Sequence, residues 1–130
     1  MAHIVKIGLV VVDEADRLLV VRKQGGATFI LPGGKREGDE SDIECLIREV
    51  REEIQVATEN IQPFGTFHAA AADQDGDTVE VRAYTGTLVG DPVPAMEIAE
   101  IAWITINDPH VPIAQSISEG IIPAIAANNW

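Results

Sequence analysis

The sequence predicts a single α/β domain built on a mixed β-sheet. Segments rich in β-branched residues occur both before and after a central segment with helical periodicity, and a second helical segment closes the chain. With 130 residues, 46% of them hydrophobic and 23% charged, the chain is long enough for one hydrophobic core and typical of a globular protein. We therefore expect one domain over residues 1–130. The expected strands are residues 4–12, 17–23, 27–31, 61–72, 78–89 and 101–106.

Turn signals connect these strands. Residues 13–16 are polar and predict a hairpin between the first two strands, and the Asp-Gly step within residues 73–77 predicts a second hairpin. The closing segment, residues 113–127, has the pattern of an amphipathic helix interrupted by Gly120 and Pro123.

The central helix has a clear start signal. Ser41 is a favourable N-cap, and Glu44 three residues later completes a capping box. Apolar residues then recur at the three- and four-residue spacing that forms one buried stripe of a helix. These residues are Ile43, Leu46, Ile47, Val50 and Ile54.

Three acids share one side of this helix. Glu49, Glu52 and Glu53 occupy an arc beside the apolar stripe, with no lysine or arginine between them. Like charges four residues apart repel, and partial burial strengthens the repulsion, so the pattern favours a bound cation. Mg²⁺ prefers oxygen ligands and uses carboxylates together with water and substrate phosphates. Arg48 stands four residues before Glu52 and can hold that carboxylate. The alternative is a solvated acidic surface with no specific ion.

The sequence around the helix resembles the Nudix box. Gly34, Glu40 and the segment REVREE at residues 48–53 match that motif in register, and LPGGK at residues 31–35 is similar to its usual lead-in. One position differs, because Gln55 stands where the family normally has glycine. Glu40 lies near the helix N-terminus, so its role is either structural or linked to the metal. The resemblance implies an α/β/α sandwich with a central mixed β-sheet, the Nudix-like fold, and hydrolysis of pyrophosphate bonds by a MutT-like enzyme.

The resemblance also implies roles for individual residues. Glu52 and Glu53 would bind the metal together with the main-chain carbonyl of Gly33. Glu49 is a further candidate metal ligand and the best candidate for activating the attacking water. Arg48 would orient the glutamates.

Residues outside the helix complete the implied site. Family members often carry a base where Arg22 and Lys23 close the second strand, and Lys35 is a candidate contact for a phosphate or a carboxylate, so these three are candidate substrate-binding residues. A further metal-binding glutamate is implied ahead of the strand at residues 101–106. Glu97 is the preferred candidate and Glu100 the competing one.

The implied function is Mg²⁺-dependent hydrolysis, with Mn²⁺ as a possible substitute, of a nucleoside diphosphate linked to another moiety. A nucleoside triphosphate giving monophosphate and pyrophosphate is the first choice. ADP-ribose-cleaving relatives often have a proline where Ala71 and Ala72 stand, and dinucleoside-polyphosphate relatives often have a tyrosine where Asp73 and Gln74 stand. The alternative is a catalytically silent Nudix-like module that binds a nucleotide or metabolite.

Composition bears on the binding partners, the location of the protein and the role of its cysteine. The net charge of −12 argues against a duplex nucleic-acid partner, although small phosphorylated substrates remain compatible because a bound cation reverses the local field. The apolar run at residues 7–12 is too short for a membrane span or a signal sequence, so we expect a cytoplasmic protein. The single cysteine, Cys45, is expected to be a packing residue. The oligomeric state is open between monomer and homodimer.

Overall fold

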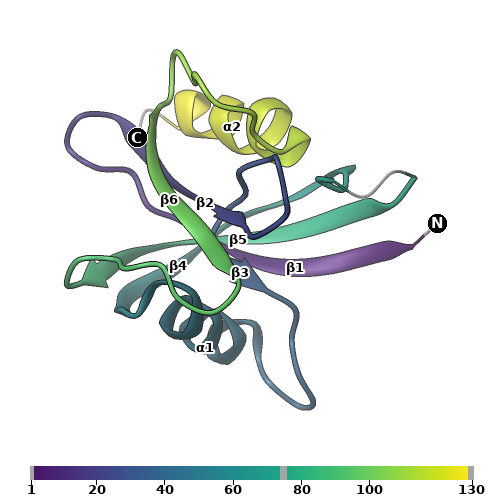
Figure 1. The fold of residues 1–130 in the computed structure, drawn as a ribbon, viewed down its shortest axis with the longest axis vertical. Helices are drawn as coiled ribbons and strands as arrows, with labels where there is room; N and C mark the ends of the chain where they lie inside the picture. Colours follow the sequence, from purple (N-terminus) through teal and green to yellow (C-terminus); the bar gives the residue numbers. More distant parts are fainter. Residues whose placement is uncertain (1, 74–75, 129–130) are drawn as a thin grey trace.

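The computed structural model describes residues 2–73 and 76–128 (Figure 1). Strands lie before and after a central helix and helical segments close the chain, as predicted. In order along the chain, the elements are β1 (His3–Val10), β2 (Arg17–Lys23), β3 (Gly33–Gly34), α1 (Asp42–Ile54), β4 (Ala57–Ala70), β5 (Thr78–Val89), β6 (Ile98–Thr105), the π-helix η1 (Ser116–Ile121) and α2 (Ile122–Ala127).

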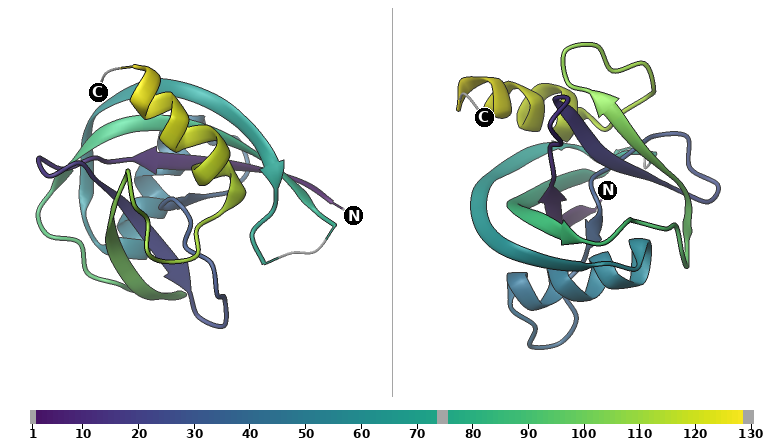
Figure 2. Two further views of the ribbon diagram at one scale, coloured as in Figure 1. Left: turned by 90° about the horizontal axis from the view of Figure 1, so that it is seen from above. Right: turned by 90° about the vertical axis from the view of Figure 1, so that its left-hand side faces the viewer.

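The central sheet is mixed, as expected. Its order is β3-β1-β5-β4, in which β1 and β5 run parallel while the other two pairs are antiparallel. A second, two-stranded sheet pairs β2 with β6. Figures 1 and 2 show α1 on one side of this β layer and α2 on the other, which is the predicted α/β/α sandwich.

The expected hairpin between the first two strands forms only at its turn. Asp13 caps that turn through its side chain, which accepts hydrogen bonds from the Ala15 and Arg17 backbone N–H groups. Beyond a bridge between Val12 and Leu18, however, the two strands separate into different sheets. The reason is that both edges of β1 are already occupied, one by β5 and the other by β3.

The expected strand at residues 27–31 is also shorter than predicted. It contributes isolated bridges only, from Ile30 to Val21 and from Phe29 to Ile113. These bridges nevertheless tie the segment before β3 to the second sheet and to the C-terminal region. The glycine pair of β3 is thereby held beside β1.

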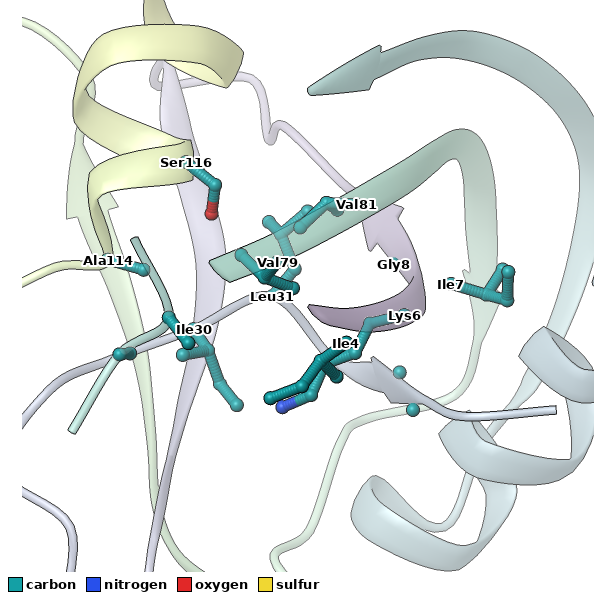
Figure 3. A pocket seen from close by; sticks show the side chains of 14 residues that line it. Ile4, Lys6, Ile7, Gly8, Ile30, Leu31, Val79, Val81, Ala114 and Ser116 are labelled. Carbon is teal, nitrogen blue, oxygen red and sulfur yellow. The ribbon is translucent and has the colours of Figure 1, made fainter. Parts of the chain in front are cut away.

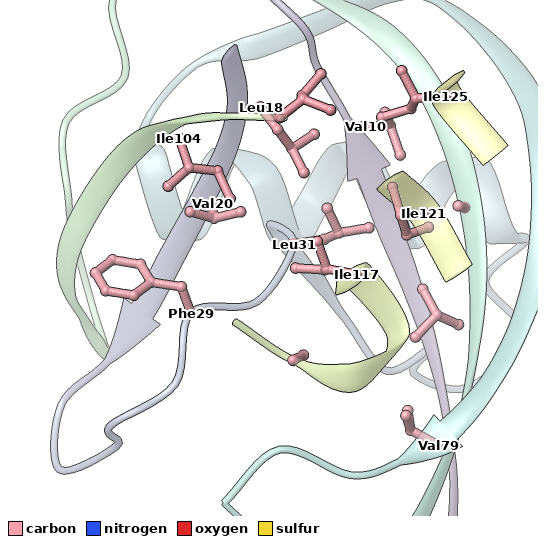
Figure 4. Packing of buried hydrophobic residues seen from close by; sticks show 14 of the residues in the cluster. Val10, Leu18, Val20, Phe29, Leu31, Val79, Ile104, Ile117, Ile121 and Ile125 are labelled. Carbon is pink, nitrogen blue, oxygen red and sulfur yellow. The ribbon is translucent and has the colours of Figure 1, made fainter. Parts of the chain in front are cut away.

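Two hydrophobic clusters fill the spaces on either side of the β layer. Alternate residues of β1 and β2 enter different clusters, because successive side chains of a strand point to opposite faces. Leu18 belongs to the cluster under η1 and α2, whereas Leu19 belongs to the cluster over α1. In Figure 4, strand side chains such as Val10 face helical side chains such as Ile121 and Ile125. Each fully buried aliphatic side chain of this kind contributes about 1.5–3 kcal/mol.

Helix α1 begins at the predicted capping box, in which the Ser41 and Glu44 side chains each accept a hydrogen bond from the other's backbone N–H. Two residues of the predicted stripe are not buried, since Ile43 is 43% exposed and Ile47 is only partly buried. Cys45, which is not part of the predicted stripe, is buried instead. The buried residues of the helix are Cys45, Leu46, Val50, Glu53 and Ile54.

The closing helix is shorter than the predicted 113–127, since it begins at Ser116, and it changes type along its length. Residues of η1 form a π-helix, and α2 continues it with Pro123 in its first turn, where a missing N–H is tolerated. Gly120 has a packing role, because a Cβ there would stand 2.7 Å from the Phe67 ring. In the described part of the chain, no helix has the length and apolarity required to cross a membrane.

Candidate active site

The glycine pair of β3 forms the floor of the site. Gly33 has φ of 146°, and a Cβ at this position would collide with the Ile7 carbonyl oxygen of β1. A Cβ on Gly34 would lie 2.5 Å from the Glu49 carboxyl carbon. Both positions therefore require glycine, one for backbone pairing and the other so that a carboxylate can rest on the main chain.

Glu53 is buried against this floor. Its side chain is 1% exposed, and Oε1 accepts a 2.9 Å hydrogen bond from the Gly33 N–H. The other oxygen, Oε2, is buried without a hydrogen-bond partner among the described residues. Burial raises the pKa of this carboxyl group to about 8. A buried carboxylate oxygen without a partner is unfavourable in the absence of a cation or a proton.

Arg48 organises the neighbouring acids. Its guanidinium donates two hydrogen bonds to Glu40, at 2.6 and 3.0 Å, and these bonds lower the pKa of the Glu40 carboxyl to about 2. Its Nη1 atom also donates to Glu49 at 2.9 Å and to Glu52 at 3.3 Å. Of the two roles open for Glu40, the geometry matches the structural one, because the bidentate pair fixes the direction of Arg48. Burial raises the pKa of Glu49.

A solvent-open cleft lies above these groups, and we call it the cationic cleft. Four of its lining residues are basic, in a chain whose net charge is −12. Glutamates from three different segments line it as well, so the cleft brings both signs of charge together. Its lining residues are Lys6, Lys23, Gly33, Gly34, Lys35, Arg36, Glu37, Glu49 and Glu97.

The structure distinguishes the two candidate glutamates, of which Glu97 precedes β6 and Glu100 lies within it. Glu97 lines the cationic cleft and forms an ion pair with Lys23 at 3.5 Å. Glu100 instead pairs with Arg22 at 3.2 Å. The Arg22 guanidinium also donates to the Gly26 carbonyl and is not among the residues that line the cleft. Lys23, Lys35 and Glu97 are thus brought together, whereas Arg22 and Glu100 lie outside.

The acids of α1 do not form a preassembled metal site. Within residues 2–73 and 76–128, no three His, Cys, Asp or Glu side chains are gathered closely enough to hold an ion as they stand. Arg48 holds Glu49 and Glu52, whereas Glu53 turns toward Gly33. The unpartnered Oε2 of Glu53 is nevertheless the feature that a hard cation would satisfy, so the donor set fits a divalent metal.

An apolar pocket adjoins the cationic cleft and is shown in Figure 3. The two share Lys6, Gly33 and Gly34, and the pocket extends between the sheet and the start of η1, where Ser116 lies. Its lining residues are Ile4, Lys6, Ile7, Gly8, Ile30, Leu31, Gly33, Gly34, Ala71, Ala72, Val79, Val81, Ala114 and Ser116.

Sequence reasoning missed Lys6, and the signal was available. Ile4, Lys6, Gly8 and Val10 alternate along β1, so they share one face of the strand. Ile4 and Val10 belong to the hydrophobic core, which makes a lysine between them an unusual residue for that face.

Comparison with known proteins decides the family. The model of the NUDIX domain matches residues 2–125. The chain belongs to the NUDIX family. A MutT NUDIX hydrolase from Burkholderia pseudomallei has the same fold, with a TM-score of 0.81 at 19% sequence identity over 95% of this chain and 98% of that one.

NUDIX relatives are also found among curated sequences. An uncharacterised Nudix hydrolase, YvcI of Bacillus subtilis, is 29% identical over 83% of this chain and 70% of that protein. The NAD-capped RNA hydrolase NudC of Pseudomonas putida is 30% identical over 92% of this chain. The chain spans only 43% of the length of that NudC protein.

These NUDIX relatives confirm the predicted family and fold. They also confirm the general prediction of an enzyme, a pyrophosphohydrolase that acts on acid anhydrides. The roles predicted for individual residues, the identity of the metal and the substrate stay predictions.

Proposed function

We propose that residues 1–130 act as one hydrolase domain that cleaves a nucleoside triphosphate to the monophosphate and pyrophosphate with the help of Mg²⁺. The observation that carries this proposal is the buried Oε2 of Glu53, unpartnered among the described residues, beside a cleft lined by four basic side chains. An acid in that position suits a cation, and the basic side chains suit phosphates.

The residues that would hold Mg²⁺, or Mn²⁺ in its place, are Glu49, Glu52, Glu53, Glu97 and the main-chain carbonyl of Gly33. When bound, the metal would neutralise charge on phosphate oxygens and make an attacking water more acidic. Arg48 already orients Glu49 and Glu52 through its hydrogen bonds to both carboxylates.

In the proposed reaction, Glu49 takes a proton from the attacking water. The water oxygen forms a bond to one phosphorus of the anhydride between the first and second phosphates, and the bridging P–O bond breaks. Its electron pair stays on the leaving group, so that monophosphate and pyrophosphate are released. Burial raises the pKa of Glu49, which makes this carboxylate a better proton acceptor near neutral pH. Arg48 orients the base, while Lys23 and Lys35 contact the phosphate chain.

The substrate class rests on the shape of the site and on the sequence. The apolar pocket beside the cationic cleft suits an apolar ring attached to phosphates, as in a nucleotide. Ala71 and Ala72 line that pocket in the region where a proline would favour ADP-ribose. Asp73 accepts hydrogen bonds from the Thr28 backbone and hydroxyl, whereas Gln74 lies outside the described residues. These features favour triphosphates over ADP-ribose or diadenosine polyphosphates.

A substrate panel tests the proposal. Nucleoside triphosphates, ADP-ribose, diadenosine tetraphosphate and NAD are incubated with and without Mg²⁺, and both products are measured. NAD is included because the NudC relatives are hydrolases of NAD-capped RNA. We expect Mg²⁺-dependent release of pyrophosphate from a triphosphate. A tenfold advantage in kcat/KM for any other class would refute the substrate assignment, and binding without turnover would indicate a silent module.

Two conservative variants test the residue roles. Glu52→Gln removes a charged ligand with little change in volume, so metal affinity and turnover should fall together. Glu49→Gln removes both a candidate ligand and the proposed base, so kcat should fall by about 10² to 10⁴, the usual effect of losing a general base, and by more than the metal affinity falls. If Glu52→Gln keeps wild-type metal affinity and rate, its carboxylate is not a ligand.

A further inference from the structure

Lys6 is a charged residue in a position that the fold otherwise reserves for the core. Ile4 and Val10, on the same face of β1, belong to the cluster beneath η1 and α2. Between them, Lys6 is only partly exposed, and burial lowers the pKa of its ammonium group. A hydrophobic side chain here would give a more stable strand, so stability does not account for the lysine.

Lys6 also lines three cavities. It lines the cationic cleft and the apolar pocket, and together with Lys23 it lines a side pocket next to Thr28 and Asp73. Figure 3 shows its side chain running alongside Ile4, with the nitrogen at the edge of the apolar pocket. A ligand that extends from the pocket into the cleft must pass this ammonium group.

The ammonium group has no hydrogen bond or ion pair to any residue in the described ranges, although an ammonium can donate three hydrogen bonds. Charges of both signs act on this ammonium group. Lys23 and Lys35 lower its pKa, whereas Glu53 and Glu97 raise it. Lys6, Lys23 and Lys35 are all the lysines in the chain, and all three line the cationic cleft. Such clustering in a protein of net charge −12 calls for an anionic ligand.

We propose that Lys6 is a substrate-binding residue that contacts the phosphate attached directly to the nucleoside, at the junction of the apolar pocket and the cationic cleft. The inference rests on the proposed function in that the cleft receives a nucleotide. Lys6 would fix the position of the phosphate chain relative to the ring, so that the anhydride bond meets the acids of α1.

The neighbouring groups favour a phosphate over a neutral acceptor. Lys23 and Lys35 repel Lys6, and an anion between them removes that repulsion, whereas a base carbonyl does not. The apolar pocket also contains the Ser116 side chain, which can serve a neutral polar group of the ring. Lys6 is therefore the group in that pocket suited to charge.

The test compares ligands with and without the phosphate in matched variants. The four common nucleoside 5′-monophosphates and the corresponding nucleosides are titrated calorimetrically into wild type, Lys6→Met, Lys6→Arg and Arg51→Met. Arg51→Met is the charge control, since Arg51 is exposed on α1 and lines neither the cationic cleft nor the apolar pocket. Comparing the monophosphate with the nucleoside in wild type and in Lys6→Met isolates the contact between Lys6 and the phosphate.

For Lys6→Met, we expect the monophosphate Kd to rise about tenfold to a hundredfold, the value of one charge-assisted hydrogen bond, and the nucleoside Kd to stay within about twofold. Lys6→Arg should recover part of the loss. The melting temperature of Lys6→Met should equal or exceed that of wild type, because an apolar side chain suits this face. A lysine with a purely structural role would instead give a lower melting temperature and unchanged monophosphate binding.

The inference is overturned if Lys6→Met binds the monophosphates as wild type does. It is also overturned if Arg51→Met weakens them equally, or if wild type binds monophosphates no better than nucleosides. Failure of the proposed function is a separate result, seen when wild type hydrolyses no triphosphate in the panel. The binding comparison still decides the role of Lys6 in that case.

Discussion

Replacing Glu53 with glutamine should remove a strong pH dependence of stability. The wild-type carboxyl group is 1% exposed, with one oxygen bonded to the Gly33 N–H and the other lacking a partner in the described part of the protein. Glutamine has nearly the same volume, and its carbonyl oxygen can accept the same hydrogen bond. The fold should therefore survive the change.

The size of this change in stability follows from the pKa of Glu53, which burial raises from 4.5 to about 8. Below pH 4.5 both the folded and the unfolded states are protonated, so the group has no effect on stability. Between pH 4.5 and about 8 only the unfolded state loses its proton, and the free energy of unfolding falls by about 1.4 kcal/mol per pH unit. By pH 7 the accumulated loss is about 3 kcal/mol.

The assay is chemical denaturation in EDTA at pH 5, 6 and 7, with wild type, Glu53→Gln and a control, Glu59→Gln. Glu59 is exposed at the start of β4, so its replacement removes a charge without changing a buried group. We expect Glu53→Gln to gain stability relative to wild type as the pH rises. Glu59→Gln should follow wild type throughout.

Mg²⁺ provides the second half of this test. A ligand that binds only the folded state at a hundred times its Kd adds about 2.7 kcal/mol to the free energy of unfolding. Wild type should gain stability when Mg²⁺ is added, and Glu53→Gln should gain little. The reasoning is refuted if Glu53→Gln and wild type lose stability in parallel between pH 5 and 7, since Glu53 would then not be the titrating group.

Three further changes test separate features. Gln55 ends α1 with φ of 60°, so Gln55→Gly should stabilise the fold by up to about 1 kcal/mol in chemical denaturation; a clear loss would show that its side chain is needed. Gly34→Ala places a Cβ 2.5 Å from the Glu49 carboxyl carbon, and the displaced carboxylate should lower kcat by about 10² in a steady-state assay; unchanged turnover would contradict this. Glu40→Gln should destabilise the fold above pH 4.5, and the difference in stability from wild type should vanish as the pH falls toward 2, because Arg48 lowers the pKa of Glu40 to about 2. Thermal melting as a function of pH measures this difference, and a difference that does not change with pH would argue against the pairing of Glu40 with Arg48.

Local signals in the sequence were sufficient for the central helix. The capping box at Ser41 and Glu44 depends on residues three apart, and the apolar repeat depends on residues three or four apart. The same range of interaction places Arg48 against Glu52. Features of this kind form within one or two helical turns, so they can be predicted without knowledge of the rest of the fold.

Non-local contacts decided the rest. The partner of β1 is β5, about 75 residues away in the sequence, and that pairing prevents the full hairpin expected with β2. Arg22 and Lys23 are neighbours in sequence, but Arg22 pairs with Glu100 whereas Lys23 pairs with Glu97, and of the two basic residues only Lys23 lines the cleft.

The sequence by itself determined the helix, its cap, its acidic side and the family to which the chain belongs. Only the tertiary structure decided that Glu53 is buried with one oxygen unpartnered among the described residues, that Glu97 rather than Glu100 lines the cleft, and that Lys6 lines it too. The physical reason is that burial and charge proximity depend on which segments meet across the sheet. These contacts join distant parts of the chain, and the spacing of residues along the sequence does not reveal them.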